Sequence, residues 1–228
     1  MALILNIETS SPVCSVCIAK DGQLLSLKET TDEKSHASLL TVFINEVLIE
    51  NKINIRDLDA VAVSEGPGSY TGLRIGVSTA KGICYGIEKP LIAVSTLEAL
   101  TFAIDKNNIS AETWFCPMID ARRMEVYSVF FDKNGVKQSE ILPHIIDADS
   151  FKNELHNRQI VFFGTGAEKC KPMLTSKNAI YIDNIMPSSS NMISLSEKAF
   201  QHQNFVNLAY FEPFYLKEFM ATTPKIKF

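Results

Sequence analysis

The fold is decided by residues 60–88, which read AVAVSEGPGSYTGLRIGVSTAKGICYGIE. The apolar run 60–63 predicts a buried strand, and the turn residues after it predict a tight loop. A helix is expected over 72–86, with Ser69 as its N-cap. This helix contains four glycines, and each lowers its stability by roughly 0.8–1 kcal/mol relative to alanine. Such a sequence predicts that another surface packs closely against the helix.

The small residues of this helix form two smooth strips. The first strip has positions four apart: Gly72, Gly76 and Ala80. The second is made by Ile75, Thr79, Gly82 and Gly86. We therefore expect the helix to pack against its own sheet and also against another helix. Tight packing on its own sheet alone is the first alternative. A phosphate-binding loop is the second, but the spacing fits neither the Walker A nor the dinucleotide pattern.

A second helix, expected over 37–51, is apolar on two sides. Its core-facing stripe consists of Leu40, Phe43, Ile44 and Val47. Val42 and Ile49 lie nearly opposite this stripe, where solvent is expected. Two apolar sides indicate two packing partners, although isolated surface apolar residues are also common.

The order of predicted elements indicates a two-lobed α/β fold. Strands at 3–9, 13–19 and 23–30 form an antiparallel meander with a hairpin at Lys20-Asp21-Gly22. The first helix, the strand and helix of 60–88, a strand at 91–94 and a helix at 96–104 complete the order βββαβαβα. This is the order of one lobe of the actin–sugar kinase–Hsp70 (ASKHA) superfamily. Asp105-Lys106-Asn107-Asn108 is the predicted break, giving lobes of 1–104 and 105–228.

The second lobe is predicted to be a smaller lobe of similar topology with a mixed sheet. Its strands are expected at 114–119, 125–131, 138–145, 160–163 and 179–182. Its helices are expected at 149–156, 167–174 and 194–203. Residues 205–228 are expected to form an irregular tail that is partly apolar and docked.

Composition excludes several classes of protein. The 228 residues are 46% hydrophobic and 21% charged, which is typical of a globular protein. The net charge of −4 argues against a freestanding RNA-binding module. No signal peptide or membrane span is expected, and five irregularly spaced cysteines favour a reducing cytoplasm. Cys14 and Cys17 are placed on opposite faces of a strand, so they do not predict a redox or metal pair.

Four segments resemble the bacterial TsaB (YeaZ) family, which takes part in making threonylcarbamoyladenosine in tRNA. They are ILNIETS at 4–10, GPGSYTGLRIGVSTAKG at 66–82, DARRMEVY at 120–127 and PFYL at 213–216. The match is dense over 2–99 and sparse after 131. The resemblance implies the ASKHA fold and a non-catalytic subunit that pairs with TsaD. It also implies that TsaE and tRNA join only through that complex, and that the chain forms a homodimer in isolation.

The groups that catalysis would need are absent from the expected positions. The turns at 8–12 and 120–123 lack the glycines of ASKHA phosphate loops. Four nucleotide-binding candidates remain: Arg122, Arg123, Gly164 and Gly166. For the two arginines, the alternative is a salt-bridged hairpin. We expect no cofactor of the chain's own, with ATP or ADP shared at a complex interface.

No metal or nucleophile site is predicted either. The four histidines, at 36, 144, 156 and 202, are not at ligand spacing. No G-x-S-x-G pattern supports a serine peptidase. The remaining alternatives are an ATP-dependent kinase or ATPase and a glycoprotease-like peptidase. The predicted partner interface consists of His36, Leu39, Val42, Phe43, Glu46, Gly72, Ile75, Gly76, Thr79, Ala80 and Ile83.

Overall fold

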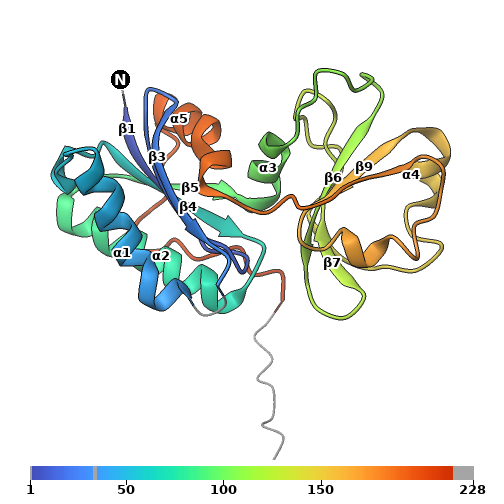
Figure 1. Cartoon of the computed structure of the whole chain (residues 1–228), viewed down its shortest axis with the longest axis horizontal. Helices are drawn as coiled ribbons and strands as arrows, with labels where there is room; N and C mark the ends of the chain where they lie inside the picture. The colour runs from blue at the N-terminus through green and yellow to red at the C-terminus, as the bar shows by residue number, and fades with distance from the viewer. Residues whose placement is uncertain (1, 33–34, 218–228) are drawn as a thin grey trace, which may run out of the picture.

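The computed structural model describes residues 2–32 and 35–217. Two five-stranded sheets lie in two lobes, and helices cover the first sheet on both faces (Figure 1). The predicted tail is described only as far as residue 217, and its remainder lies outside the described residues.

The first sheet has the strand order β3-β2-β1-β4-β5. Its strands are β1 (Leu3–Glu8), β2 (Cys14–Lys20), β3 (Gln23–Thr30), β4 (Ala60–Gly66) and β5 (Leu91–Ser95). The first three are antiparallel neighbours, and β4 and β5 continue parallel to β1. The predicted hairpin is confirmed, because Asp21 and Gly22 both have positive φ, as a two-residue turn requires.

Four helices surround this sheet. On one face lie α1 (Ser35–Glu50) and α2 (Tyr70–Ile87), whose apolar sides share one core with the sheet. On the other side lie α3 (Thr96–Leu100) and α5 (Ile193–Gln201). A short 3₁₀ turn, η1 (Ile55–Asp57), precedes β4. Because α5 packs on β1 and β5, a segment from late in the chain returns to the first lobe.

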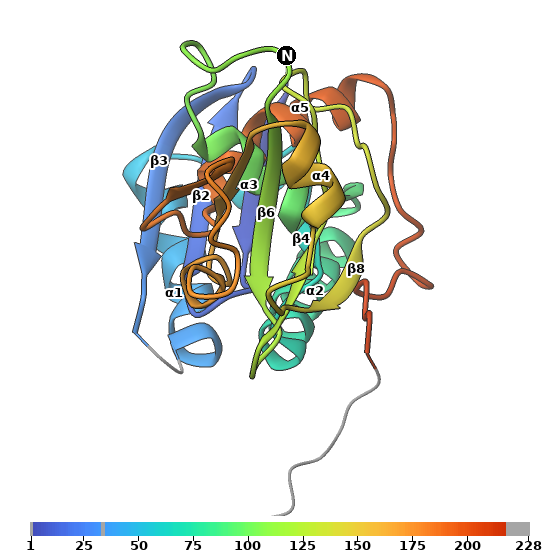
Figure 2. The same cartoon turned by 90° about the vertical axis from the view of Figure 1, so that its right-hand side faces the viewer.

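The second sheet repeats the same order and the same strand directions, as β8-β7-β6-β9-β10. Its strands are β6 (Trp114–Asp120), β7 (Glu125–Ser128), β8 (Leu142–Ile145), β9 (Ile160–Phe163) and β10 (Ala179–Ile182). The other elements are η2 (Thr101–Ala103), α4 (Lys152–Asn157), η3 (Glu168–Cys170) and η4 (Ser189–Met192). Figure 2 faces this lobe, with β6 near its centre. The repeat confirms the two-lobed ASKHA-like fold, whereas the lobe boundary at 104/105 stays a prediction.

Several predicted elements of the second lobe are shorter than expected, and among them the strand expected over 125–131 is only β7, which ends at Ser128. The helix expected over 167–174 is only the single turn η3, since Pro172 has no N–H to continue the hydrogen bonding. The strand expected over 138–145 is only β8, which sits at the sheet edge and tolerates Pro143. Before it, Lys137 forms only an isolated bridge with Phe131.

The tail is docked, as predicted, within the described residues. Val206 forms a bridge with Leu91 on the open edge of β5. The Lys81 ammonium on α2 donates to the carbonyl oxygens of Ala209 and Phe211, at 3.2 Å each. Among residues 2–32 and 35–217, no helix is long and apolar enough to cross a bilayer.

Candidate functional site

A cleft of about 900 Å³ lies between the two lobes. Its walls come from the β1–β2, β4–α2 and β6–β7 turns, the loop after β9, the linker after β10 and the C-terminal segment. The corresponding residues are 10–12, 67–70, 119–122, 127, 164, 165, 167, 168, 182–186 and 214–217. The structure thus brings the predicted nucleotide-loop candidates Arg122 and Gly164 to one cleft, with Ser10 opposite them.

The first smooth strip of α2 is packed against the chain's own β1–β2 turn. A Cβ added to Gly72 would overlap the carbonyl oxygen of Thr9, and one added to Gly76 would overlap the Thr9 hydroxyl. Ala80 is fully buried. Ser69 caps the helix as predicted, because its hydroxyl accepts a hydrogen bond from Gly72 N at 3.3 Å. These small residues therefore fit α2 closely to its own lobe, and their predicted place at a partner interface stays a prediction.

The second strip of α2 is open. A Cβ added to Gly82 or Gly86 would meet no atom within 4 Å. Ile75, Thr79 and Ile83, along the same helix, are half-buried. Tyr85 beside them is 81% exposed. The two strips that sequence reasoning treated alike therefore lie in different surroundings.

Helix α1 carries the two apolar sides that its sequence predicts. Leu40, Ile44 and Val47 are buried, whereas Val42 is 43% exposed and Ile49 is 65% exposed. The other predicted interface residues of α1 are half-buried: His36, Leu39, Phe43 and Glu46. The His36 Nε2 lies 3.2 Å from the carbonyl oxygen of Val13, and Glu46 lies 3.7 Å from the Lys28 ammonium. Their role toward a partner stays a prediction.

Sequence reasoning missed a buried carboxyl group at the end of β1. Glu8 is 1% exposed, and its Oε1 accepts a hydrogen bond from Ser10 N at 2.6 Å. No hydrogen-bond partner reaches its Oε2 among the described residues. Burial raises the pKa of Glu8, and its hydrogen bonds with Ser10 oppose the rise. The alternation of β1 was the available signal, because Glu8 shares a face with the buried Ile4.

The β6–β7 hairpin holds its two arginines in a rare backbone conformation. Arg122 and Arg123 have φ of 68° and 49°, in the left-handed region. Asp120 pairs with Lys169, and Glu125 pairs with Lys217. Within the described part of the chain, no ion pair or hydrogen bond engages either guanidinium group. The hairpin is therefore salt-bridged through lysines that the sequence interpretation did not single out.

The remaining nucleotide-site candidates have a structural explanation. A Cβ on Gly164 would lie 2.5 Å from the Met118 carbonyl oxygen, and one on Gly166 would lie 2.8 Å from Val126. Both glycines therefore let their loop lie close against β6 and β7. Their role in nucleotide binding stays a prediction. Among residues 2–32 and 35–217, no three acidic, His or Cys side chains are arranged to hold a metal ion.

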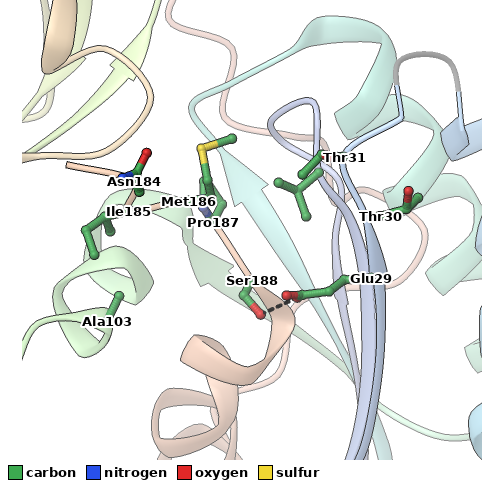
Figure 3. Close-up of a pocket in the computed structure, with 10 residues that line it drawn as sticks. Glu29, Thr30, Thr31, Ala103, Asn184, Ile185, Met186, Pro187 and Ser188 are labelled. Atoms are coloured by element: carbon green, nitrogen blue, oxygen red, sulfur yellow. Dashed lines mark hydrogen bonds between the residues drawn. The ribbon is translucent and has the colours of Figure 1, made fainter.

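A second cavity of about 620 Å³ lies beside β3 (Figure 3), and the linker residues 184–186 after β10 line both this cavity and the cleft. Its lining residues are Val13, 29–31, Ala103 and 184–188. The Glu29 Oε2 accepts hydrogen bonds from Ser188 Oγ at 2.8 Å and from Ser15 Oγ at 2.9 Å. This carboxylate joins the linker to the first sheet.

The five cysteines take no part in either cavity. All are buried and free. Cys14 and Cys17 lie in different cores, on opposite faces of β2, which confirms that they do not form a pair. Burial raises the pKa of Cys14 to about 11 and that of Cys17 to about 12, so both are thiols at neutral pH.

Comparison with known proteins identifies the family. Residues 28–223 match the family model of TsaD, described as tRNA N6-adenosine threonylcarbamoyltransferase. The chain is 27% identical over 224 residues to the tRNA threonylcarbamoyladenosine biosynthesis protein TsaB of Escherichia coli K12, covering 96% of both. It is 29% identical over 175 residues to TsaB of Bacillus subtilis 168, covering 75% of this chain and 74% of that protein.

A solved structure supports the fold. The structure of YeaZ from Pseudomonas aeruginosa has a TM-score of 0.76 and 24% identity, covering 95% of this chain and 100% of that chain. A second Pseudomonas aeruginosa structure, described as similar to the peptidase YeaZ, has a TM-score of 0.82 at the same identity. The chain therefore belongs to the TsaD family, in its TsaB (YeaZ) branch.

Proposed function

We propose that this chain is a non-catalytic subunit in the formation of threonylcarbamoyladenosine in tRNA, acting by docking onto a TsaD-type subunit. The names of its relatives support the pathway and favour it over a kinase or peptidase activity. One observation carries the docking role, namely the open strip of α2. Gly82 and Gly86 reduce helix stability, and nothing in their own lobe accounts for them.

A partner helix would account for these two glycines. Without a side chain at either position, a second backbone can approach α2 closely. Helix α1, which packs against α2, adds two exposed apolar side chains, Val42 and Ile49, to the same layer of helices. In the absence of the partner, the same surface on a second copy can pair with it, giving a two-fold homodimer.

The lack of catalysis rests on the two turns that face the cleft. Neither the β1–β2 turn nor the β6–β7 turn contains a glycine, so neither offers the unhindered backbone with which ASKHA loops hold a phosphate. We place ATP or ADP, where one binds, at the shared interface, with Arg122, Arg123, Gly164 and Gly166 as the candidate residues on this chain. TsaE and tRNA reach the chain through the complex, because its net charge of −4 does not attract RNA.

The substitution Gly82→Arg tests the docking surface. It introduces a long charged side chain at a position where the isolated chain has open space, so the fold should be retained. Asn153→Arg is the matched control, since it adds the same charge to an exposed position on the second-lobe helix α4. Size-exclusion chromatography with the TsaD-type subunit of the same organism measures complex formation.

The wild type and the Asn153→Arg variant should co-elute with the partner, and the Gly82→Arg variant should elute separately. Neither variant should melt below the wild type, and Gly82→Arg should melt slightly above it, because arginine favours a helix over glycine. Co-elution of a folded Gly82→Arg variant at wild-type affinity would contradict the proposed docking surface.

A further inference from the structure

The C-terminal segment Pro213–Lys217 begins on the first lobe. Phe214 N donates a hydrogen bond of 2.7 Å to the carbonyl oxygen of Glu65, at the end of β4. A Cβ added to Gly66, whose φ is 107°, would lie 3.1 Å from the Phe214 carbonyl oxygen. Glycine at this position therefore lets the segment lie directly on the β4–α2 loop.

An aromatic pair holds the middle of the segment to α2. The ring centroids of Tyr215 and Tyr70 are 4.8 Å apart, with an interplanar angle of 36°. Arg74, one turn further along α2, lies over the Tyr70 ring at 5.5 Å and donates to its hydroxyl at 3.3 Å. Tyr70 is the first residue of α2, so this pair fixes the segment to the helix that starts beside the cleft.

The segment then reaches the second lobe. The Lys217 ammonium forms an ion pair with Glu125 Oε2 on β7. The Glu125 side chain is only 18% exposed, so solvent screens this pair less than a fully exposed one. Phe214, Tyr215, Leu216 and Lys217 all line the cleft. In Figure 1 this part of the chain lies between the two lobes.

We propose that Pro213–Lys217 is a clasp that ties the two lobes together and sets the width of the cleft. One end is fixed to β4 and α2, and the other to β7. Its contacts lie at the surface, so the clasp can release while the cores stay packed, including the cluster in which Leu97 and Leu100 of α3 pack against the second sheet. Release would let the cleft open about this α3 junction and widen for a ligand or a partner segment.

The separation of the lobes can be measured directly. Spin labels attached at Lys20→Cys in the first lobe and Lys177→Cys in the second lobe report the interlobe distance by pulsed electron paramagnetic resonance. Both positions are exposed, whereas the five native cysteines are buried and should not react. Dilution with unlabelled protein removes signals between two copies of the chain.

Three substitutions are compared in this labelled chain. Tyr215→Ala removes the aromatic pair, and Lys217→Gln removes the ion pair to the second lobe. Lys152→Gln is the matched control, because it breaks an exposed ion pair, with Asp149, that lies wholly within the second lobe.

The labelled wild type and the Lys152→Gln variant should show one narrow distance distribution. Tyr215→Ala and Lys217→Gln should each broaden this distribution. The double variant that combines them should shift the distribution to longer distances. Retention of the wild-type distribution by the double variant, with an unchanged circular dichroism spectrum, would overturn the clasp. This result would leave the docking proposal untouched, because Gly82 does not contact the segment.

Discussion

Gly72 and Gly82 occupy one helix, yet a methyl group added at each meets different surroundings. At Gly72 it would overlap the backbone of Thr9, whereas at Gly82 it would enter open space. We expect Gly72→Ala to lower the free energy of unfolding by about 1–3 kcal/mol, as overpacking does. We expect Gly82→Ala to raise it by up to about 1 kcal/mol, because alanine favours the helix.

Urea denaturation of both variants measures these changes, and the m-value checks that the unfolding transition is comparable. If both substitutions changed the free energy of unfolding in the same direction, the division of α2 into a packed first strip and an open second strip would be contradicted. A stabilised Gly82→Ala variant that also binds its partner less tightly would show that the glycine is kept for the interface rather than for the fold.

Glu8 makes stability depend on pH. Burial raises the pKa of Glu8 above its ordinary value of 4.5, so the folded chain keeps this proton where the unfolded chain has lost it. The contribution of protonated Glu8 to the free energy of unfolding is therefore complete below pH 4.5. It is lost as the pH rises through the pKa of Glu8 in the folded chain.

The variant Glu8→Gln should escape this loss, because an amide is neutral at every pH. Its stability relative to wild type should rise between pH 4.5 and pH 7.5, as followed by thermal unfolding across the range. Glu140→Gln, at a side chain that is 83% exposed, serves as the control and should show no such trend. A stability difference for Glu8→Gln that stays constant with pH would refute the buried-carboxyl account.

The β6–β7 hairpin places two residues with long side chains in a backbone conformation that favours glycine or asparagine. Arg122 and Arg123 both adopt positive φ, which costs a residue with a side chain roughly 1–2 kcal/mol. Replacement by Asn-Gly, two residues that tolerate positive φ better than arginine does, should therefore stabilise the chain by about 1–2 kcal/mol.

Replacement by Lys-Lys keeps the charge without relieving the backbone, and it should leave stability unchanged. Calorimetry of the two double variants distinguishes these cases. Equal melting temperatures for the two double variants would show that the hairpin is not strained. Loss of nucleotide binding by the complex with the Asn-Gly variant would support an anion-binding role for the two arginines.

Helices and strands of the first lobe could be predicted because their apolar residues follow clear periods. The same periods indicated which residues of α2 share a face, but not which surface covers that face. Thr9 covers Gly72 and Gly76, and it is distant from both in sequence. In the second lobe, short strands and Pro172 left little periodic signal, so the predicted extents were wrong. The alternation of β1 placed Glu8 on the face of Ile4, but only the packing of later elements on that face shows that the carboxyl group is buried.

The whole molecule is a two-lobed ASKHA-like scaffold with a net charge of −4. A negative chain gains little from releasing counterions from RNA. We expect no measurable tRNA binding by the isolated chain in filter-binding assays at physiological salt. Binding by the reconstituted complex should appear and should fall steeply as salt increases. Tight, salt-dependent binding by the chain alone would contradict an indirect role toward tRNA.

Reconstitution of tRNA modification tests the central claim most directly. Threonylcarbamoyladenosine is measured by mass spectrometry of nucleosides from tRNA incubated with the TsaD-type subunit, the other components and this chain. The account predicts modified tRNA with the wild type and with Asn153→Arg, and none when the chain is omitted or replaced by folded Gly82→Arg. Equal modification with Gly82→Arg, or without the chain, would contradict it.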